Sequence, residues 1–144
     1  MKIKVKNSGI VRLTTRKDAR RGDLFVAESM KNIPFAIKRV YSVNNIKDPA
    51  VVRGHHAHKK TKQVIFCANG SFKLSLDDGK RKQEIFLSTH AFGIILGPML
   101  WHTMSGFSKD CVIVVFASEH YNEKDYIRSY EDFLKLVKKH EQRK

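Results

Sequence analysis

The sequence predicts a single, almost entirely β domain, a sandwich or a barrel, followed by one helix near the C-terminus. Most of the 144-residue chain consists of short apolar runs, many of them separated by Gly, Asn or Asp. Such runs are typical of strands joined by tight turns. From Asn122 onward the apolar spacing becomes helical. A chain of this length can bury a substantial core, so we expect residues 1–144 to form one domain.

Six segments are expected to be strands. The first, "IPFAIKRVYSV" at residues 33–43, alternates so that Ile37, Arg39, Tyr41 and Val43 share one face. The others are residues 62–68, 72–76, 83–87, 91–96 and 111–117. Two turn sequences, "NGS" at 69–71 and "DDGK" at 77–80, predict hairpins between neighbouring strands.

The segment "NEKDYIRSYEDFLKLVKKHEQRK" predicts the C-terminal helix. Asn122 is a favourable N-cap, and Glu123 and Asp125 would complement the helix dipole in the first turn. We therefore expect a helix over about 122–140. Its apolar face would consist of Tyr126, Tyr130, Phe133, Leu134 and Val137.

Composition narrows the choice of partners and compartment. The chain has 28 Lys and Arg against 14 Asp and Glu, a net charge of +14, which implies an anionic partner. That partner could be nucleic acid, a membrane surface or a phosphorylated small molecule. The basic residues are scattered, which is more typical of plain solvation than of a nucleic-acid-binding surface, and we expect neither nucleic acid nor a membrane as partner. No run approaches the roughly 18 apolar residues of a membrane span, and the basic N-terminus lacks an apolar signal-peptide region. We expect a cytoplasmic protein with Cys67 and Cys111 as buried, reduced thiols.

The segment "RGHHAHKK" at residues 53–60 is the first candidate functional element. It places three histidines within four positions, next to an arginine and two lysines. On a strand, His56 and His58 would point to one face and His55 to the other. The segment alone is compatible with a metal site, a base beside an anion clamp, or a basic surface loop.

Spacing to later residues favours a site inside a barrel. His56 and His58, followed by Gln63 and Gly70, resemble the first motif of the cupin superfamily. "GPMLWHTM" at 97–104 resembles the second motif and would turn His102 inward. The resemblance implies an all-β jelly-roll β-barrel in which the three histidines converge. Metal-binding cupins carry a glutamate where this chain has Gln63, whose neutral amide is a poor ligand, so we expect no metal.

A closer resemblance is to the sugar 3,4-ketoisomerases. It is carried by "IPFAIKRVY", "RGHHAHKKTKQVIFCANGSFKLSLDDG", "GPMLWHTM" and "DCVIVVFASEHYNEKDYIRSYEDF", and runs from about Gly22 to Phe133. These cupin enzymes act on dTDP-4-keto-6-deoxyglucose in the synthesis of dTDP-3-amino sugars for surface glycans such as lipopolysaccharide O-antigen or an S-layer. The resemblance implies a homodimer with exchanged N-terminal strands. A dehydratase would act before this enzyme and a pyridoxal-phosphate aminotransferase after it.

The implied reaction moves a ketone from carbon 4 to carbon 3 through an enediol and needs no cofactor. By resemblance, His58 is the expected base at carbon 3, with His56 as its neighbour. Histidine suits this step because its ordinary pKa is about 6.5. The developing enolate oxygen needs hydrogen-bond donors. The candidates for this role are Arg39, Tyr41, Arg53 and Gln63.

Other residues are expected to bind the rest of the substrate. Arg53 and Lys60 are candidates for the diphosphate. Trp101 is either a wall of the sugar site or part of the core. Tyr126 and Arg128 either reach the nucleotide or pack on the helix.

The resemblance also bears on the configuration of the product at carbon 4. The branch of the family that gives an axial hydroxyl carries Arg in an early segment and His after the Trp. The other branch has Tyr and Arg at these places. Here they are Arg21 and His102, which predicts dTDP-3-keto-6-deoxygalactose as product.

Two alternatives remain open from the sequence. One is a metal-dependent cupin enzyme, against which Gln63 speaks. The other is a non-catalytic barrel that binds a nucleotide sugar or nucleic acid. Nucleic-acid binding predicts aromatic residues interleaved with basic ones on an exposed strand. "FKLSL" offers one such aromatic, and this reading leaves the histidines unexplained.

Overall fold

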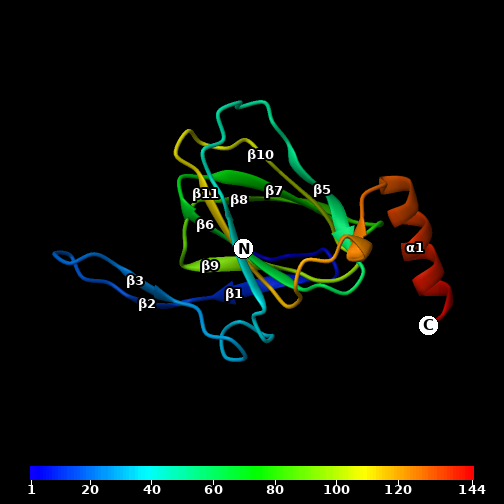
Figure 1. Cartoon of the computed structure of the whole chain (residues 1–144), viewed down its shortest axis with the longest axis horizontal. Coiled ribbons are helices and arrows are strands. Elements are labelled where there is room, and N and C mark those ends of the chain that lie inside the picture. Colours follow the sequence, from blue (N-terminus) through cyan, green and yellow to red (C-terminus); the bar gives the residue numbers. More distant parts are fainter.

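The computed structural model describes residues 1–144 as two facing five-stranded antiparallel sheets, a two-stranded arm and one C-terminal α-helix (Figure 1). The first sheet has the order β1 (Ser8–Arg12), β9 (Phe92–Leu96), β6 (Gln63–Asn69), β11 (Val112–Ala117), β4 (Arg39–Val43). The second has the order β12 (Tyr126–Ile127), β5 (Arg53–His58), β10 (Trp101–Ser105), β7 (Phe72–Asp77), β8 (Lys82–Leu87). The predicted all-β jelly roll with a C-terminal helix is confirmed.

The apolar runs predicted five of the strands closely, and the sixth in part. Strand β4 begins at Arg39 rather than at residue 33. The preceding segment instead lies across the outer face of the first sheet. There Ile33 and Phe35 are buried against Val64 and Phe66. Covering this apolar face removes it from water, which is favourable.

One predicted hairpin turn is confirmed and the other is wrong. The "DDGK" turn joins β7 to β8, which pair in register. The "NGS" turn joins β6 of the first sheet to β7 of the second, so it is a corner between sheets. Its Gly70 has a φ of 69°, and a Cβ there would lie 2.1 Å from the Ser108 hydroxyl oxygen.

The C-terminal helix starts later than predicted. Asn122 caps a short 3₁₀ turn, Glu123–Asp125, after which Tyr126 and Ile127 pair with β5 as strand β12. Helix α1 spans Tyr130–Gln142 and is capped by Ser129, whose side chain accepts from the Asp132 N–H. The helical period predicted α1 but could not reveal that the chain first adds a strand to β5.

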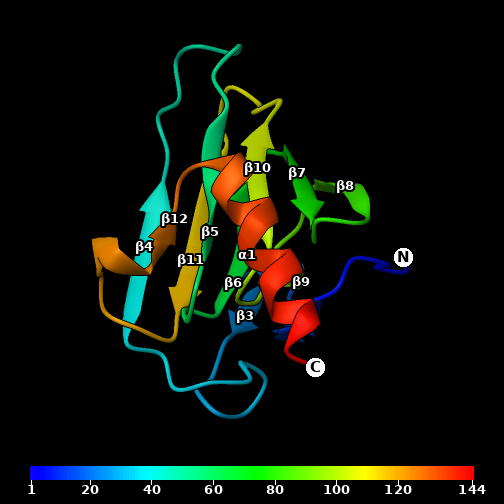
Figure 2. The ribbon, with the colours of Figure 1, turned by 90° about the vertical axis from the view of Figure 1, so that its right-hand side faces the viewer.

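Helix α1 packs over the outer face of the second sheet, in front of β5 and β10 (Figure 2). Phe133 is fully buried there against Ala57, Trp101 and Ile127. The main core lies between the two sheets and contains Cys67 and Cys111, both buried and unbridged. No helix of this structure has the length and apolarity needed to cross a membrane.

An arm leaves the barrel at the end opposite to α1 (Figure 1). It consists of β2 (Thr14–Arg16) and β3 (Leu24–Val26), which pair only with each other. Leu24 is 54% exposed on this arm. An isolated two-stranded hairpin is marginally stable in water. Within one chain, Phe25 of the arm packs against His90, at 4.4 Å between ring centroids.

Candidate active site

A cavity of about 340 Å³ lies between the two sheets and holds most of the predicted site residues. Strands β4, β6 and β11 form one wall, and β5, β10 and β12 form the other. Alternation along each strand places every second side chain in the cavity. The predicted residues that line it are Arg39, Tyr41, Arg53, His56, Gln63, His102, Tyr126 and Arg128.

His56 and His102 meet across the β5–β10 ladder. They pair in register, and their ring centroids are 4.6 Å apart. The register shifts just beyond this pair, so His55 is the extra residue of a β-bulge and is exposed, as predicted. Gly54 is required in this bulge, because a Cβ there would lie 2.7 Å from the His102 carbonyl oxygen.

Backbone carbonyls determine which nitrogen carries the hydrogen in the neutral rings of His56 and His102. Nδ1 of His56 lies 3.0 Å from the Gly54 carbonyl, and Nδ1 of His102 lies 3.2 Å from that of Leu100. Since a carbonyl only accepts, each Nδ1 carries the hydrogen and each Nε2 keeps its lone pair. Burial, followed by the neighbouring histidines, lowers the pKa of His56 to about 4 and that of His102 to about 3. At neutral pH, His56 therefore presents a base to the cavity.

These depressed pKa values predict acid-sensitive stability. In the unfolded chain both histidines titrate near their ordinary pKa of about 6.5, whereas in the fold they titrate at about 4 and about 3. Between these values the unfolded chain binds more protons, so the free energy of unfolding falls as the pH falls below about 6.5. We expect a slope on the order of 1 kcal/mol per pH unit for each histidine. Denaturant unfolding at several pH values measures it.

His102→Asn should reduce this slope, and His140→Asn, at an exposed position on α1, should leave it unchanged. Equal slopes in all three proteins would contradict the assignment.

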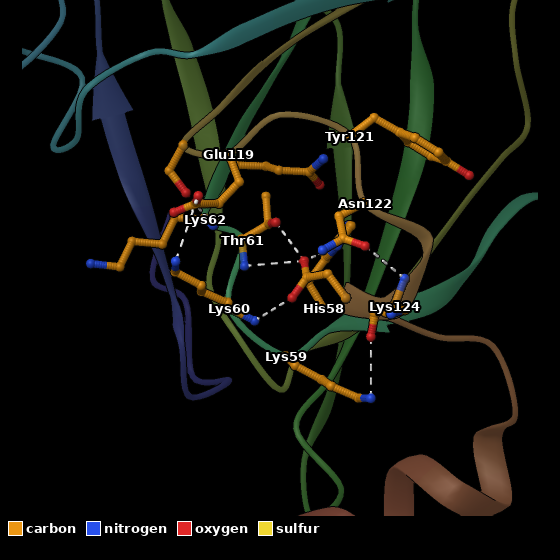
Figure 3. Close-up of polar contacts among 12 residues, drawn as sticks. His58, Lys59, Lys60, Thr61, Lys62, Glu119, Tyr121, Asn122 and Lys124 are labelled. Atoms are coloured by element: carbon orange, nitrogen blue, oxygen red, sulfur yellow. Dashed lines mark hydrogen bonds and ion pairs between the residues drawn. The ribbon is translucent and has the colours of Figure 1, made fainter.

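His58 is held by a carboxylate that the sequence analysis did not select. His58 is 2% exposed, and its Nδ1–H donates to Asp125 Oδ2 at 3.0 Å. The same carboxylate accepts from the Thr61 hydroxyl and, at 2.7 Å, from the Lys60 N–H (Figure 3). Burial alone would raise the pKa of Asp125, but these hydrogen bonds outweigh burial and lower it, so the carboxylate is charged.

His58 lies behind the cavity wall. The Tyr126 ring packs over it at 4.5 Å between centroids, and the His56 ring lies 5.0 Å away. His58 Nε2 is buried and has no hydrogen-bond partner. The structure thus brings His56 and His58 together as predicted, but only His56 lines the cavity.

The opposite wall carries a phenol and an amide. Gln63 Nε2 donates to the Tyr41 hydroxyl oxygen at 3.0 Å. The Arg39 guanidinium carbon lies 5.5 Å from the centre of the Tyr41 ring. Burial raises the pKa of Tyr41, so its hydroxyl stays protonated and can donate a hydrogen bond. Arg39 Nε and Gln63 Oε1 are buried without partners.

Cations gather at the cavity. Arg39, Arg53 and Arg128 all line it. Arg128 makes a bidentate pair with Glu123, at 2.6 and 2.9 Å, and its guanidinium lies 4.4 Å from the centre of the Tyr126 ring. Hydrogen bonds from Arg128 and Tyr121 lower the pKa of Glu123 to about 2. Three guanidinium groups suit a diphosphate better than a neutral ligand.

Three predicted site residues lie elsewhere in this chain. Trp101 faces outward from β10, 5.7 Å from the Phe133 ring, which favours the core alternative over a wall of the sugar site. Strand alternation turns His102 inward and therefore Trp101 outward. Lys60 is exposed and pairs with Glu119 at 3.8 Å (Figure 3), so it does not reach the cavity either. Arg21 lies in the turn between β2 and β3, at the tip of the arm, where it pairs with Asp18.

The donor set does not suit a metal ion. No group of three or more His, Cys, Asp or Glu side chains is arranged to hold one. Gln63, at the place of the cupin glutamate, directs its amide nitrogen to Tyr41. The cavity therefore offers hydrogen-bond donors and a base rather than a metal centre.

Comparison with known proteins agrees with this chemistry. Residues 6–138 match the family model described as "FdtA: WxcM-like, C-terminal". The chain belongs to this family. A curated relative from Aneurinibacillus thermoaerophilus, TDP-4-oxo-6-deoxy-alpha-D-glucose-3,4-oxoisomerase, is 51% identical over 119 residues, covering 83% of this chain and 85% of its own.

Solved structures of QdtA from Thermoanaerobacterium thermosaccharolyticum, a sugar 3,4-ketoisomerase, are similar to this structure. The TDP complex superposes with a TM-score of 0.90 at 38% identity, covering 94% of this chain and 97% of QdtA. A His-to-Asn mutant was solved with TDP-4-keto-6-deoxyglucose (TM-score 0.90, 37% identity, coverage 94% and 96%). A double mutant, Tyr to Arg and Arg to His, was solved with TDP (TM-score 0.91, 39% identity, coverage 94% and 97%). The present protein is thus an isomerase of the 3,4-ketoisomerase type.

Proposed function

We propose that this protein converts dTDP-4-keto-6-deoxyglucose to dTDP-3-keto-6-deoxygalactose, in the cytoplasmic synthesis of dTDP-3-amino sugars for surface glycans. The observation that carries the proposal is a neutral histidine, His56, whose bare Nε2 belongs to a cavity that also holds a phenol donor and three arginines. The relatives that act on or bind TDP sugars support the choice of substrate.

The base at carbon 3 is His56 rather than His58, which the family resemblance suggested first. A base must reach the proton that it removes. His56 lines the cavity, whereas Tyr126 covers His58. His58, polarised by Asp125 and packed 5.0 Å from His56, instead orients and electrostatically supports that ring.

The isomerisation balances without a cofactor. His56 Nε2 takes the proton on carbon 3, the C–H electron pair forms the C3–C4 π bond, and the carbonyl π pair moves to the carbon-4 oxygen. Tyr41 supplies a hydrogen bond to that oxygen, which takes up a proton. The carbon-3 hydroxyl then loses its proton and becomes a carbonyl, and the C3–C4 π pair takes a proton from the imidazolium at carbon 4. One proton moves between the carbons, and one between the oxygens.

The nucleotide end of the substrate lies against the arginines. Arg53 at the mouth and Arg128 on the β12 side supply planar, multidentate donors for the two phosphates. Tyr126 offers an aromatic face between them and the histidines. Tyr126 lies on β12 and Arg128 directly follows this strand, so both precede α1 and line the cavity, which supports binding roles for both.

A homodimer completes the site. The β2–β3 arm exposes Leu24 and carries Arg21 away from its own barrel (Figure 1). Packed on a second copy, the arm would bury this surface and bring Arg21 to the other copy's cavity. Light scattering should give twice the chain mass of 16.6 kDa.

The direct test is to incubate the chelator-treated protein with dTDP-4-keto-6-deoxyglucose in deuterium oxide and follow the sugar by proton NMR. We expect a 3-keto sugar, and the deuterium content at carbon 4 measures how much of the His56 imidazolium proton exchanges with solvent before it reaches that carbon. The coupling between carbon-4 and carbon-5 protons reports the product face when the reaction is repeated in ordinary water. An unchanged substrate, or turnover only after metal is added, would overturn the proposal.

A further inference from the structure

We propose that Gln63 is a positioning residue that aims the phenolic proton of Tyr41 at the substrate's carbonyl oxygen. The inference rests on the proposed function, since it assigns how one donor of that reaction is oriented. It gives Gln63 a role other than that of a direct donor to the enolate.

The two side chains are held rigidly. Gln63 lies on β6 and is 1% exposed, and Tyr41 lies on β4. Both strands pair with β11, where Gln63 is opposite Ala117 and Tyr41 is opposite Val115. The 3.0 Å contact between Gln63 Nε2 and the Tyr41 oxygen therefore joins groups whose backbones the same sheet fixes.

The direction of this hydrogen bond fixes the phenolic proton. An amide nitrogen can only donate, so the Tyr41 oxygen accepts from Gln63 and its own hydrogen must point elsewhere. The charged neighbours of Tyr41, Arg39 and Arg53, are also only donors and cannot take that hydrogen. The proton is therefore left for a ligand in the cavity. A glutamate at this position would instead accept the proton and remove it from the reaction.

The free oxygen of the amide extends the argument. Gln63 Oε1 is buried without a partner, and Gln63 lines the same cavity as Tyr41. Buried acceptors are normally satisfied, so this atom is suited to a hydroxyl of the ligand. Together the pair presents a donor beside an acceptor. This matches a carbonyl next to a hydroxyl, which both the substrate and the product carry at carbons 3 and 4.

The test is a double-mutant cycle with Gln63→Glu and Tyr41→Phe, assayed with chelator present. We expect each single variant to lose about 10²-fold in kcat, the usual loss for one oxyanion donor, with affinity for dTDP within about threefold of wild type. The double variant should be no worse than Tyr41→Phe alone, because Gln63→Glu keeps an acceptor oxygen for the ligand hydroxyl and removes only the N–H that donates to the phenol. Gln142→Glu, the same change at an exposed position on α1, is the matched control and should behave as wild type.

A second measurement does not depend on turnover. The Gln63 hydrogen bond lowers the pKa of Tyr41 against the larger effect of burial. Ultraviolet titration, with Tyr41→Phe subtracted, should show this phenol ionising at higher pH in Gln63→Glu and in Gln63→Met. Losses that multiply in the double variant, or an unshifted phenol, would overturn the inference. A wild type without turnover, but with the shifted phenol, would overturn only the proposed function.

Discussion

His56→Asn is expected to lose about 10²- to 10⁴-fold in kcat, the contribution of a general base, while it keeps its fold and its affinity for dTDP. Asparagine retains a polar group of similar size but has no nitrogen lone pair that can take a proton. The arginines that bind the diphosphate are untouched. The rate at which the 3-keto sugar forms, followed by NMR, measures the loss of turnover, and calorimetry with dTDP checks binding.

Comparison with two other histidines makes this result specific. His58→Asn should lose less than His56→Asn, because His58 acts through the neighbouring ring and Asp125. His55→Asn, an exposed position in the same bulge, should retain wild-type turnover. If His58→Asn were inactive and His56→Asn nearly fully active, the base would be His58, as the family resemblance first suggested.

Replacing Arg21 with Tyr and His102 with Arg should invert the product at carbon 4, to the gluco configuration. His102 is 3% exposed and lines the cavity beside His56, so a longer cationic side chain there changes which face of the enediol can be protonated. Proton NMR distinguishes the epimers, because the coupling between carbon-4 and carbon-5 protons is large only when both are axial.

The matched control exchanges the adjacent arginine. Arg20→Tyr with His102→Arg should give less of the inverted product than the Arg21 combination, since only Arg21 is assigned to the site. Arg20 and Arg21 are both exposed, and the Asp18 carboxylate accepts from both backbone N–H groups. The galacto product from the Arg21 combination would remove the stereochemical argument, and equal inversion by both would move the assignment to His102 alone.

The strands that carry the cavity residues could be predicted from sequence, because the alternation of side chains that marks a strand involves only neighbouring residues. Alternation along residues 39–43 placed Arg39 and Tyr41 on one face, and the same rule joined His56 with His58. Turn chemistry identified the β7–β8 hairpin for the same reason. The resemblance of the histidine motifs then predicted that His102 would meet His56, which the β5–β10 register bears out.

The periodicity of apolar residues could not predict contacts between segments far apart in the sequence. Asp125 and His58 are 67 positions apart, and nothing near Asp125 distinguishes it from an acidic residue in the first turn of a helix. Tyr126 and Ile127 pair with β5. This pairing makes α1 start later than the sequence predicted, and it brings Arg128 to the cavity. The helical spacing of apolar residues continues through this strand, because the spacing reports only where apolar residues recur and not which backbone conformation they adopt.

Local sequence patterns thus predicted the strands and the inward histidines. The sequence also shows an amide, Gln63, at the position where metal-binding cupins carry a carboxylate. The packing of whole elements selected which of these side chains share the cavity. The pairing of β12 with β5 placed Tyr126 over His58. The packing of α1 on the outer face of the same sheet buried Trp101 in the core. Such choices depend on which apolar faces cover one another. The free energy gained when apolar faces are removed from water depends on pairs of elements far apart along the chain. It therefore cannot be read from any single stretch of sequence.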